Sequence, residues 1–123
     1  MKEGQAMSME EVAAIAGKAM DGLYARATAI AHNVANANSA GFSPLRVTFE
    51  DALSAAAAMR PGDTAAIRRE RVEAVRPQTL ATPDTVRLDL EIADASLTSA
   101  RYTLLAGVLA RTLQLTQLAV RGG

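Results

Sequence analysis

The stretch SMEEVAAIAGKAMDGLYARATAIAHNVANAN, residues 8–38, decides the fold. Ser8 followed by Glu11 has the S-x-x-E spacing of a capping box, in which two side chains satisfy free amides at the start of a helix. Beyond it, small and apolar residues recur in alternating steps of three and four: Ala13, Ala16, Met20, Leu23, Ala27, Ile30, Val34 and Ala37. This heptad seam contains no proline, so it predicts one long helix from about residue 9 to residue 38.

A second long helix is predicted at the other end of the chain, from about residue 89 to residue 120. Its apolar residues form two adjoining stripes, one of Leu97, Leu104, Val108, Leu115 and Leu118, the other of Tyr102, Leu105, Leu109 and Leu113. Together the stripes are wider than a two-stranded seam needs, which predicts contact with more than one neighbouring helix. We therefore expect an all-α dominated fold whose terminal helices form a coiled-coil-like hairpin or bundle.

The terminal helices are expected to meet through a helix-packing seam. Its members are Ala16, Met20, Leu23, Ala27, Ile30 and Val34 from the first helix, and Leu97, Tyr102, Leu105 and Leu109 from the last. Bulky side chains are scarce, because the chain has two Tyr, two Phe and no Trp. Alanine favours helix but buries little area, so we expect a chain that gains part of its burial from neighbouring molecules.

A turn and a short helix are predicted over residues 39–59. Gly41 can adopt the positive φ that stops a helix, and Pro44 forces the residue before it out of the helical region. Thr48 to Asp51 then has the spacing of a second capping box, which predicts a short helix that ends near Met59.

Residues 60–87 show no clear helical or strand period, so we expect an irregular middle segment. Short extended pieces are possible at Val72–Val75 and Val86–Leu90, where apolar and polar residues alternate. The charged run from Arg68 to Arg76 contains acidic residues of its own and is interpreted as a solvated segment. We take residues 1–123 as a single domain.

Composition argues against several classes of function. With 13 Lys and Arg against 13 Asp and Glu, the chain lacks the basic excess of a nucleic-acid-binding protein. It has no cysteine and one histidine, too few ligands for a zinc site, and its glycines form no phosphate-binding loop. We expect no catalytic residue, cofactor, metal, nucleic acid or small-molecule substrate. We also expect no membrane span and no cleaved signal peptide, because the chain has no apolar stretch of sufficient length.

The single histidine, His32, is interpreted as a polar residue on the surface of the first helix. A histidine phosphotransfer domain that uses His32 is an alternative, but the residue one turn later is Asn36, which is not a usual helper group. A cytoplasmic helical adaptor or export chaperone is a second alternative.

Three asparagines, Asn33, Asn36 and Asn38, lie within six residues at the end of the first helix. Asparagine is unfavourable inside helices because its amide competes with the backbone for hydrogen bonds. Two interpretations remain open. The asparagines cap a fraying helix end, or their buried amides fix the register between helices in an assembly.

The segment around these asparagines resembles the N-terminal signature of the flagellar basal-body rod protein family, approximately N-[IV]-A-N-x-x-T-x-G-[FY]. The residues that match are Asn33, Val34, Ala35, Asn36, Gly41 and Phe42, and Asn38 lies between them. Ser39 replaces the usual threonine, and Ala40 stands where proline is frequent. Within the family, the short chain and the segments at residues 46–53 and 86–92 are most similar to proximal-rod proteins.

This resemblance implies a structural subunit of the bacterial flagellar rod. Such a subunit is exported without a cleaved signal peptide through the flagellar type III export apparatus and assembles in the periplasm. Its partners are other copies of itself and other rod proteins, which it contacts through its terminal helices. The seven motif residues would then act in assembly.

Overall fold

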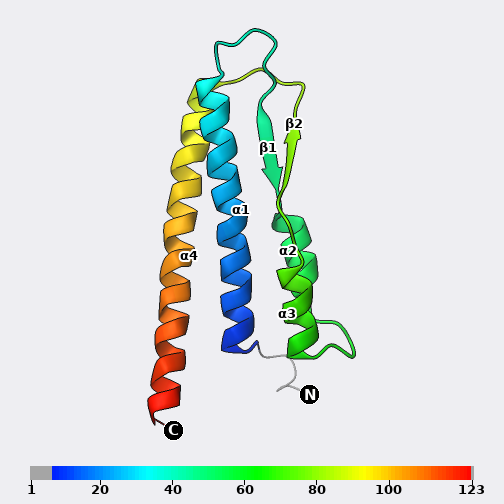
Figure 1. Cartoon of the computed structure of the whole chain (residues 1–123), viewed down its shortest axis with the longest axis vertical. Coiled ribbons are helices and arrows are strands. Elements are labelled where there is room, and N and C mark those ends of the chain that lie inside the picture. Colours follow the sequence, from blue (N-terminus) through cyan, green and yellow to red (C-terminus); the bar gives the residue numbers. More distant parts are fainter. Residues whose placement is uncertain (1–6, 123) are drawn as a thin grey trace.

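The structure is a computed structural model that describes residues 7–122. Within that range the chain forms four helices and one two-stranded sheet (Figure 1). The elements are α1 (Met9–Ala35), β1 (Leu45–Thr48), α2 (Glu50–Ala57), α3 (Ala65–Glu73), β2 (Gln78–Ala81) and α4 (Leu88–Gly122). The predicted all-α dominated fold with long terminal helices is therefore confirmed. The expectation about a signal peptide falls largely on residues 1–6, which lie outside the described residues.

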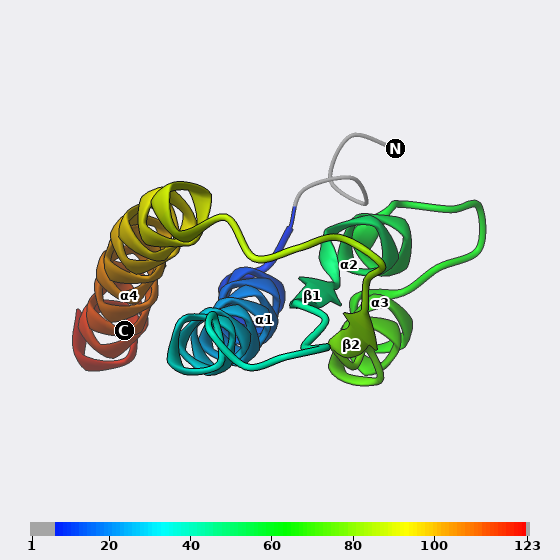
Figure 2. The same cartoon turned by 90° about the horizontal axis from the view of Figure 1, so that it is seen from above.

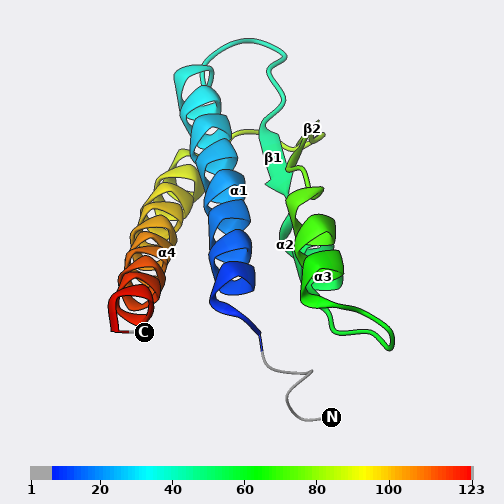
Figure 3. The same ribbon diagram turned by 60° about the horizontal axis from the view of Figure 1, so that its bottom comes forward.

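The elements are arranged in three layers with α1 in the middle. Figure 2 shows α4 on one side of α1, and α2, α3 and the two strands on the other. The same order is visible in Figures 1 and 3, where α1 and α4 run antiparallel. Since the extensive contacts of α4 are with α1, the C-terminal helix is an outer layer with one neighbouring helix.

Helix α1 begins as its sequence predicts. The backbone amide of Ser8 donates to the Glu11 carboxylate at 3.0 Å, and the amide of Glu11 donates to the Ser8 hydroxyl at 3.1 Å. The helix ends at Ala35, three residues before the predicted end at Asn38, with Asn36 as its C-cap. The Asn36 side chain donates to the carbonyl of His32 at 2.9 Å and so competes with continued helix formation. Gly41 then takes a φ of 73°, which reverses the chain.

The second capping box is not formed, and this prediction was wrong. Helix α2 begins at Glu50 after Phe49, which makes no side-chain capping bond. Thr48 lies instead at the end of strand β1, where it is paired with Gln78 of β2. The antiparallel register runs from Leu45 opposite Ala81 to this pair. The strands therefore occupy other residues than the two extended pieces that alternation predicted.

The prediction of an irregular segment at residues 60–87 was also wrong, because it contains helix α3 and strand β2. The N-cap Thr64 accepts a hydrogen bond from the amide of Ile67 at 3.1 Å. Helix α3 has only one buried apolar residue, Val72, so it lacks the apolar periodicity that would reveal it. Its other buried residue is Arg68, which contradicts the interpretation of this run as solvated.

The hydrophobic core lies between α1 and the part of the chain from β1 to β2, residues 45–81. From here on, we call residues 45–81 the middle segment. Its buried members are Leu23, Ala29, Val47, Phe49, Leu53, Ala56 and Val72, of which only the first two come from α1. The Phe49 ring packs directly on Gly22, where a Cβ atom would lie 2.4 Å from the ring. Residues 39–59 thus supply four of the seven core residues, helix α1 supplies two, and the segment expected to be irregular supplies Val72.

Candidate assembly site

Asn33 is the point at which three elements meet. Its side chain is completely buried, and its amide nitrogen donates to the Leu45 carbonyl and to Glu91 Oε1, both at 3.0 Å. Its amide oxygen accepts from the Leu45 backbone nitrogen at 2.8 Å. One side chain therefore joins α1 to the start of β1 and to the first turn of α4. This arrangement matches the interpretation of buried amides that fix the register, though within one chain.

Glu91 is the partner that α4 brings to this junction, and its side chain is also completely buried. Oε1 accepts from Asn33, and Oε2 lies 2.9 Å from a guanidinium nitrogen of Arg46 on β1. Oε2 makes no well-aligned hydrogen bond, so it is held by the charge of the guanidinium. A buried carboxylate requires such a partner, because the loss of hydration is costly. We call Asn33, Arg46 and Glu91 the polar junction.

The other motif residues lie at the surface around the end of α1. Val34, Ala35, Asn38 and Gly41 are exposed, while Asn36 and Phe42 are half-buried. The Phe42 ring meets the exposed His32 ring edge-on, with 5.4 Å between their centroids. Of the three asparagines, Asn33 is buried, Asn36 caps the helix, and Asn38 is solvated. The capping interpretation therefore applies to Asn36, while Asn33 has the buried amide that the other interpretation requires and its role in an assembly stays a prediction.

The seam between α1 and α4 differs from the predicted one. Glu91, Thr98 and Thr112 are the buried residues of α4, and each is a multiple of seven residues from the others. Of the predicted α4 members, Leu105 and Leu109 are half-buried. Leu97 is 48% exposed, so its assignment to the seam was wrong for the single chain. The leucines at positions 90, 97 and 104 recur every seven residues and hid a polar series that starts one position later, at Glu91.

Three of the six predicted α1 seam residues are buried, and the two exposed ones border a groove. Ala16, Leu23 and Ile30 are buried and Met20 is half-buried, whereas Ala27 and Val34 are exposed. A groove of about 710 Å³ runs between α1 and α4, and Ala27, Val34 and Tyr102 are among its lining residues. The lining is apolar apart from hydroxyl groups, so these three residues leave an apolar surface uncovered in the single chain.

A second uncovered apolar surface lies along α4. We call it the α4 stripe, and its apolar members are Leu90, Leu97, Leu104, Val108, Leu115 and Leu118. Their exposed fractions lie between 38% and 68%. A row of exposed apolar residues of this length typically marks an interaction site. The predicted second neighbour of this helix is therefore absent from the single chain.

Helix α4 also has the length and composition of a membrane span. It is the only helix within residues 7–122 that contains an 18-residue apolar stretch with no more than two charged side chains. The expectation that no segment has this character is thereby corrected. Length and composition alone are weak evidence for a span, since core helices of other proteins meet the same criterion.

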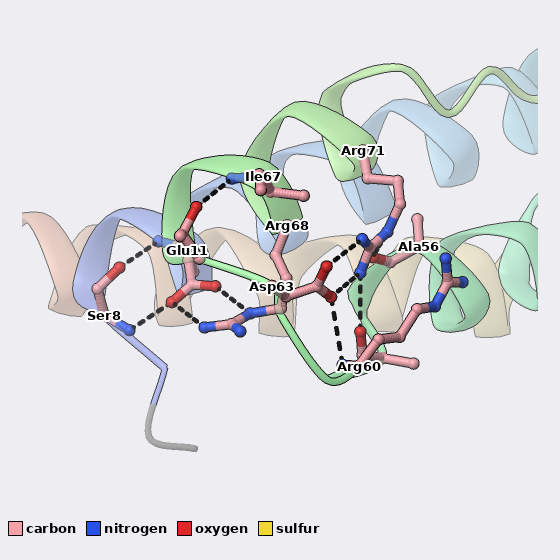
Figure 4. Close-up of polar contacts among 10 residues, drawn as sticks. Ser8, Glu11, Ala56, Arg60, Asp63, Ile67, Arg68 and Arg71 are labelled. Carbon is pink, nitrogen blue, oxygen red and sulfur yellow. Dashed lines mark hydrogen bonds and ion pairs between the residues drawn. The ribbon is translucent and has the colours of Figure 1, made fainter. Parts of the chain in front are cut away.

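One ion pair attaches helix α3 to the beginning of α1, and a second holds the loop before α3. Arg68 donates to the buried Glu11 carboxylate at 2.6 Å, and this hydrogen bond is the main reason that the pKa of Glu11 lies below its ordinary value (Figure 4). Arg71 holds Asp63 in the same way at 2.8 Å and lowers the pKa of that carboxyl. Figure 4 shows that both arginines come from α3 and point toward different elements.

A third pair joins α1 to the start of α2. Arg26 donates to Glu50 at 2.8 Å and to the Val47 carbonyl at 2.6 Å, and its guanidinium lies 5.0 Å from the centre of the Phe49 ring. The hydrogen bond from Arg26 lowers the pKa of Glu50. Sequence reasoning missed all three pairs, because the partners of two pairs are 57 and 24 residues apart and the third pair depends on helix α3, which was not predicted.

No known protein family, curated protein or solved structure matches this chain significantly. Among residues 7–122, no three His, Cys, Asp or Glu side chains are grouped so that they could hold a metal ion. The candidate site consists of three features: the polar junction, the groove between α1 and α4, and the α4 stripe.

Proposed function

We propose that the chain is a structural subunit of the bacterial flagellar basal-body rod, similar to the proximal-rod protein FlgB. It would be exported by the flagellar type III apparatus without a cleaved signal peptide and would assemble in the periplasm with other rod proteins and with copies of itself. Its role would be mechanical, through helix packing, with no catalytic step.

The observation that carries this proposal is the position of Asn33. This residue belongs to the motif that resembles the rod family, and it ties the two terminal helices to β1 through three hydrogen bonds. Motif residues of an assembly protein are expected where the terminal helices are positioned against each other.

The uncovered surfaces support the same proposal. The groove between α1 and α4 and the α4 stripe are both apolar and both accessible. Repeated head-to-tail contacts between unlike surfaces produce open helical assemblies, and a chain with two such surfaces has the means to make them. Burial of these surfaces between subunits would supply the stability that the small core lacks.

No specific observation favours phosphotransfer at His32. The imidazole lies 3.4 Å from the Asn36 amide and against the edge of Phe42, and two of the four described helices have only eight and nine residues. An adaptor or chaperone would also need the uncovered surfaces, so location in the cell separates it from a rod subunit.

The test is location combined with a groove variant. In the source bacterium, mass spectrometry of purified hook–basal bodies is expected to detect the chain, and immunogold labelling should place it at the base of the rod. Ala27→Glu puts a charge into the groove at an exposed helical position, so cells should lose swimming while the purified variant keeps its melting temperature. Ala66→Glu, on the exposed side of α3, is the matched control and should swim. A purely cytoplasmic chain would contradict the proposal.

A further inference from the structure

The α4 stripe contains charged residues in a pattern that specifies what covers it. In steps of four and three, the full series is Leu90, Asp94, Leu97, Arg101, Leu104, Val108, Arg111, Leu115 and Leu118. This is an uninterrupted heptad seam with one acidic residue near its start and two basic residues further along. Asp94, Arg101 and Arg111 are exposed and make no ion pair among the described residues.

The apolar members of the stripe lie beside the contact with α1, while Asp94 is at its edge and borders a small cavity with Arg26 of α1 and Arg46 of β1. The residues of α4 that face α1 come one position after Leu90, Leu97 and Leu104. Successive residues are about 100° apart around a helix, so these leucines are rotated by that angle from the α1 contact. The groove lies on the other side of that contact, because Ser99 and Thr103 line it. A molecule seated on the stripe therefore leaves the groove free.

We propose that the α4 stripe pairs two copies of this chain as an antiparallel, two-fold symmetric dimer. The axis would pass at the level of Tyr102 and Thr103, midway between Asp94 and Arg111. Layer by layer, the residues that face one another across the pair are Leu90 with Leu115, Asp94 with Arg111, Leu97 with Val108, and Arg101 with Leu104.

This register places no like charges in facing layers. By symmetry, Asp94 meets Arg111 twice, once in each half of the dimer, and Arg101 can lay its aliphatic stem along Leu104 with its head in water. The parallel arrangement would place Asp94 on Asp94, Arg101 on Arg101 and Arg111 on Arg111. Like charges in facing layers are unfavourable, and the aligned helix dipoles would add to the cost.

The dimer does not depend on the proposed rod function, but it would affect it. An isologous pair is closed, so it covers the most exposed apolar surface without open-ended growth. For a rod subunit, this pair would be a resting form that must separate before the stripe can meet a rod neighbour.

Sedimentation equilibrium of the purified full chain tests the pairing first. We expect a reversible species of twice the 12.9 kDa chain mass. Asp94→Arg should raise the dimer dissociation constant at least about tenfold, because two attractive contacts become repulsive. Arg111→Asp should do the same, and the double variant Asp94→Arg/Arg111→Asp should restore dimerisation. Glu70→Arg, on the exposed surface of α3, is the control and should leave the constant unchanged.

Cysteine cross-linking tests the direction, because the chain has no cysteine of its own. A mixture of Leu97→Cys and Val108→Cys chains should form disulfide-linked dimers much faster than either variant alone. Faster cross-linking of each variant with itself would overturn the antiparallel register. A monomer at 100 μM, a larger oligomer, or a monomer that instead binds vesicles of phosphatidylcholine and phosphatidylglycerol would overturn the dimer itself.

Discussion

The two faces of α1 show how differently one helix can be used. Its contact with the middle segment contains the apolar core and two arginine–carboxylate pairs, Glu11 with Arg68 and Arg26 with Glu50. Its contact with α4 buries mainly Glu91 and two threonines from the facing helix, while the apolar residues of the α4 stripe stay exposed. The first interface stabilises the single chain, and the second positions a helix whose apolar stripe stays exposed.

The largest expected effect tests the first interface. Phe49→Ala should lower the free energy of unfolding by about 3–5 kcal/mol, because the ring packs on Gly22 and no other aromatic residue enters the core. Urea denaturation followed by circular dichroism measures the change. Phe42→Ala is the matched control on the half-buried ring near His32 and should cost about 1 kcal/mol. Equal losses would mean that the core is not centred on the middle segment.

The polar junction should give the next largest effect. Asn33→Ala removes three hydrogen bonds, so the Leu45 amide and Glu91 Oε1 lose the Asn33 side chain while Arg46 still contacts the Leu45 carbonyl and Glu91 Oε2; the loss should cost about 2–4 kcal/mol. Asn38→Ala, at an exposed position in the same motif, should change stability by less than about 0.5 kcal/mol. If Asn33→Ala changed stability as little as Asn38→Ala, the motif would have no structural explanation.

A smaller effect should appear on acidification. Because Arg68 lowers the pKa of Glu11 in the folded chain, this carboxylate stabilises the fold above its unfolded pKa of about 4.5, and the contribution is lost as the pH falls through the folded value. The urea midpoint of the wild type should therefore fall below about pH 4.5. Glu11→Gln keeps the hydrogen-bonding capacity of the capping box but removes the charge, so its midpoint should fall less. The control Glu10→Gln, at the exposed neighbouring position, should follow the wild type.

The smallest effect on stability should come from the leucines of α4. Leu104 is 68% exposed, so Leu104→Ser should change the free energy of unfolding by less than about 0.5 kcal/mol when the chain is kept monomeric by dilution. Leu23→Ala, at a position 3% exposed, should cost about 2–5 kcal/mol under the same conditions. A similar loss at both positions would show that α4 already buries its stripe within the chain.

Local signals in the sequence were reliable where the physical cause is local. The capping box at Ser8 and Glu11 starts α1 as predicted, and α4 begins and ends within two residues of its predicted bounds. By contrast, Thr48 had the spacing of a cap but belongs to a strand, because its pairing with Gln78 outweighs a single capping bond. Helix α3 was missed since the contacts that stabilise it come from Glu11 and the core, far away in the chain.

The sequence by itself determined two long amphipathic helices, since helix periodicity and capping depend only on residues a few positions apart. It also determined that α4 has more apolar surface than one partner can cover. Only the tertiary structure decided which stripe of α4 faces α1, because Leu97 and Thr98 are adjacent and hydrophobicity alone favours the leucine. The buried hydrogen bond between Asn33 and Glu91 selects the polar series instead. An unpaired buried carboxylate or amide costs more free energy than a leucine that stays in water.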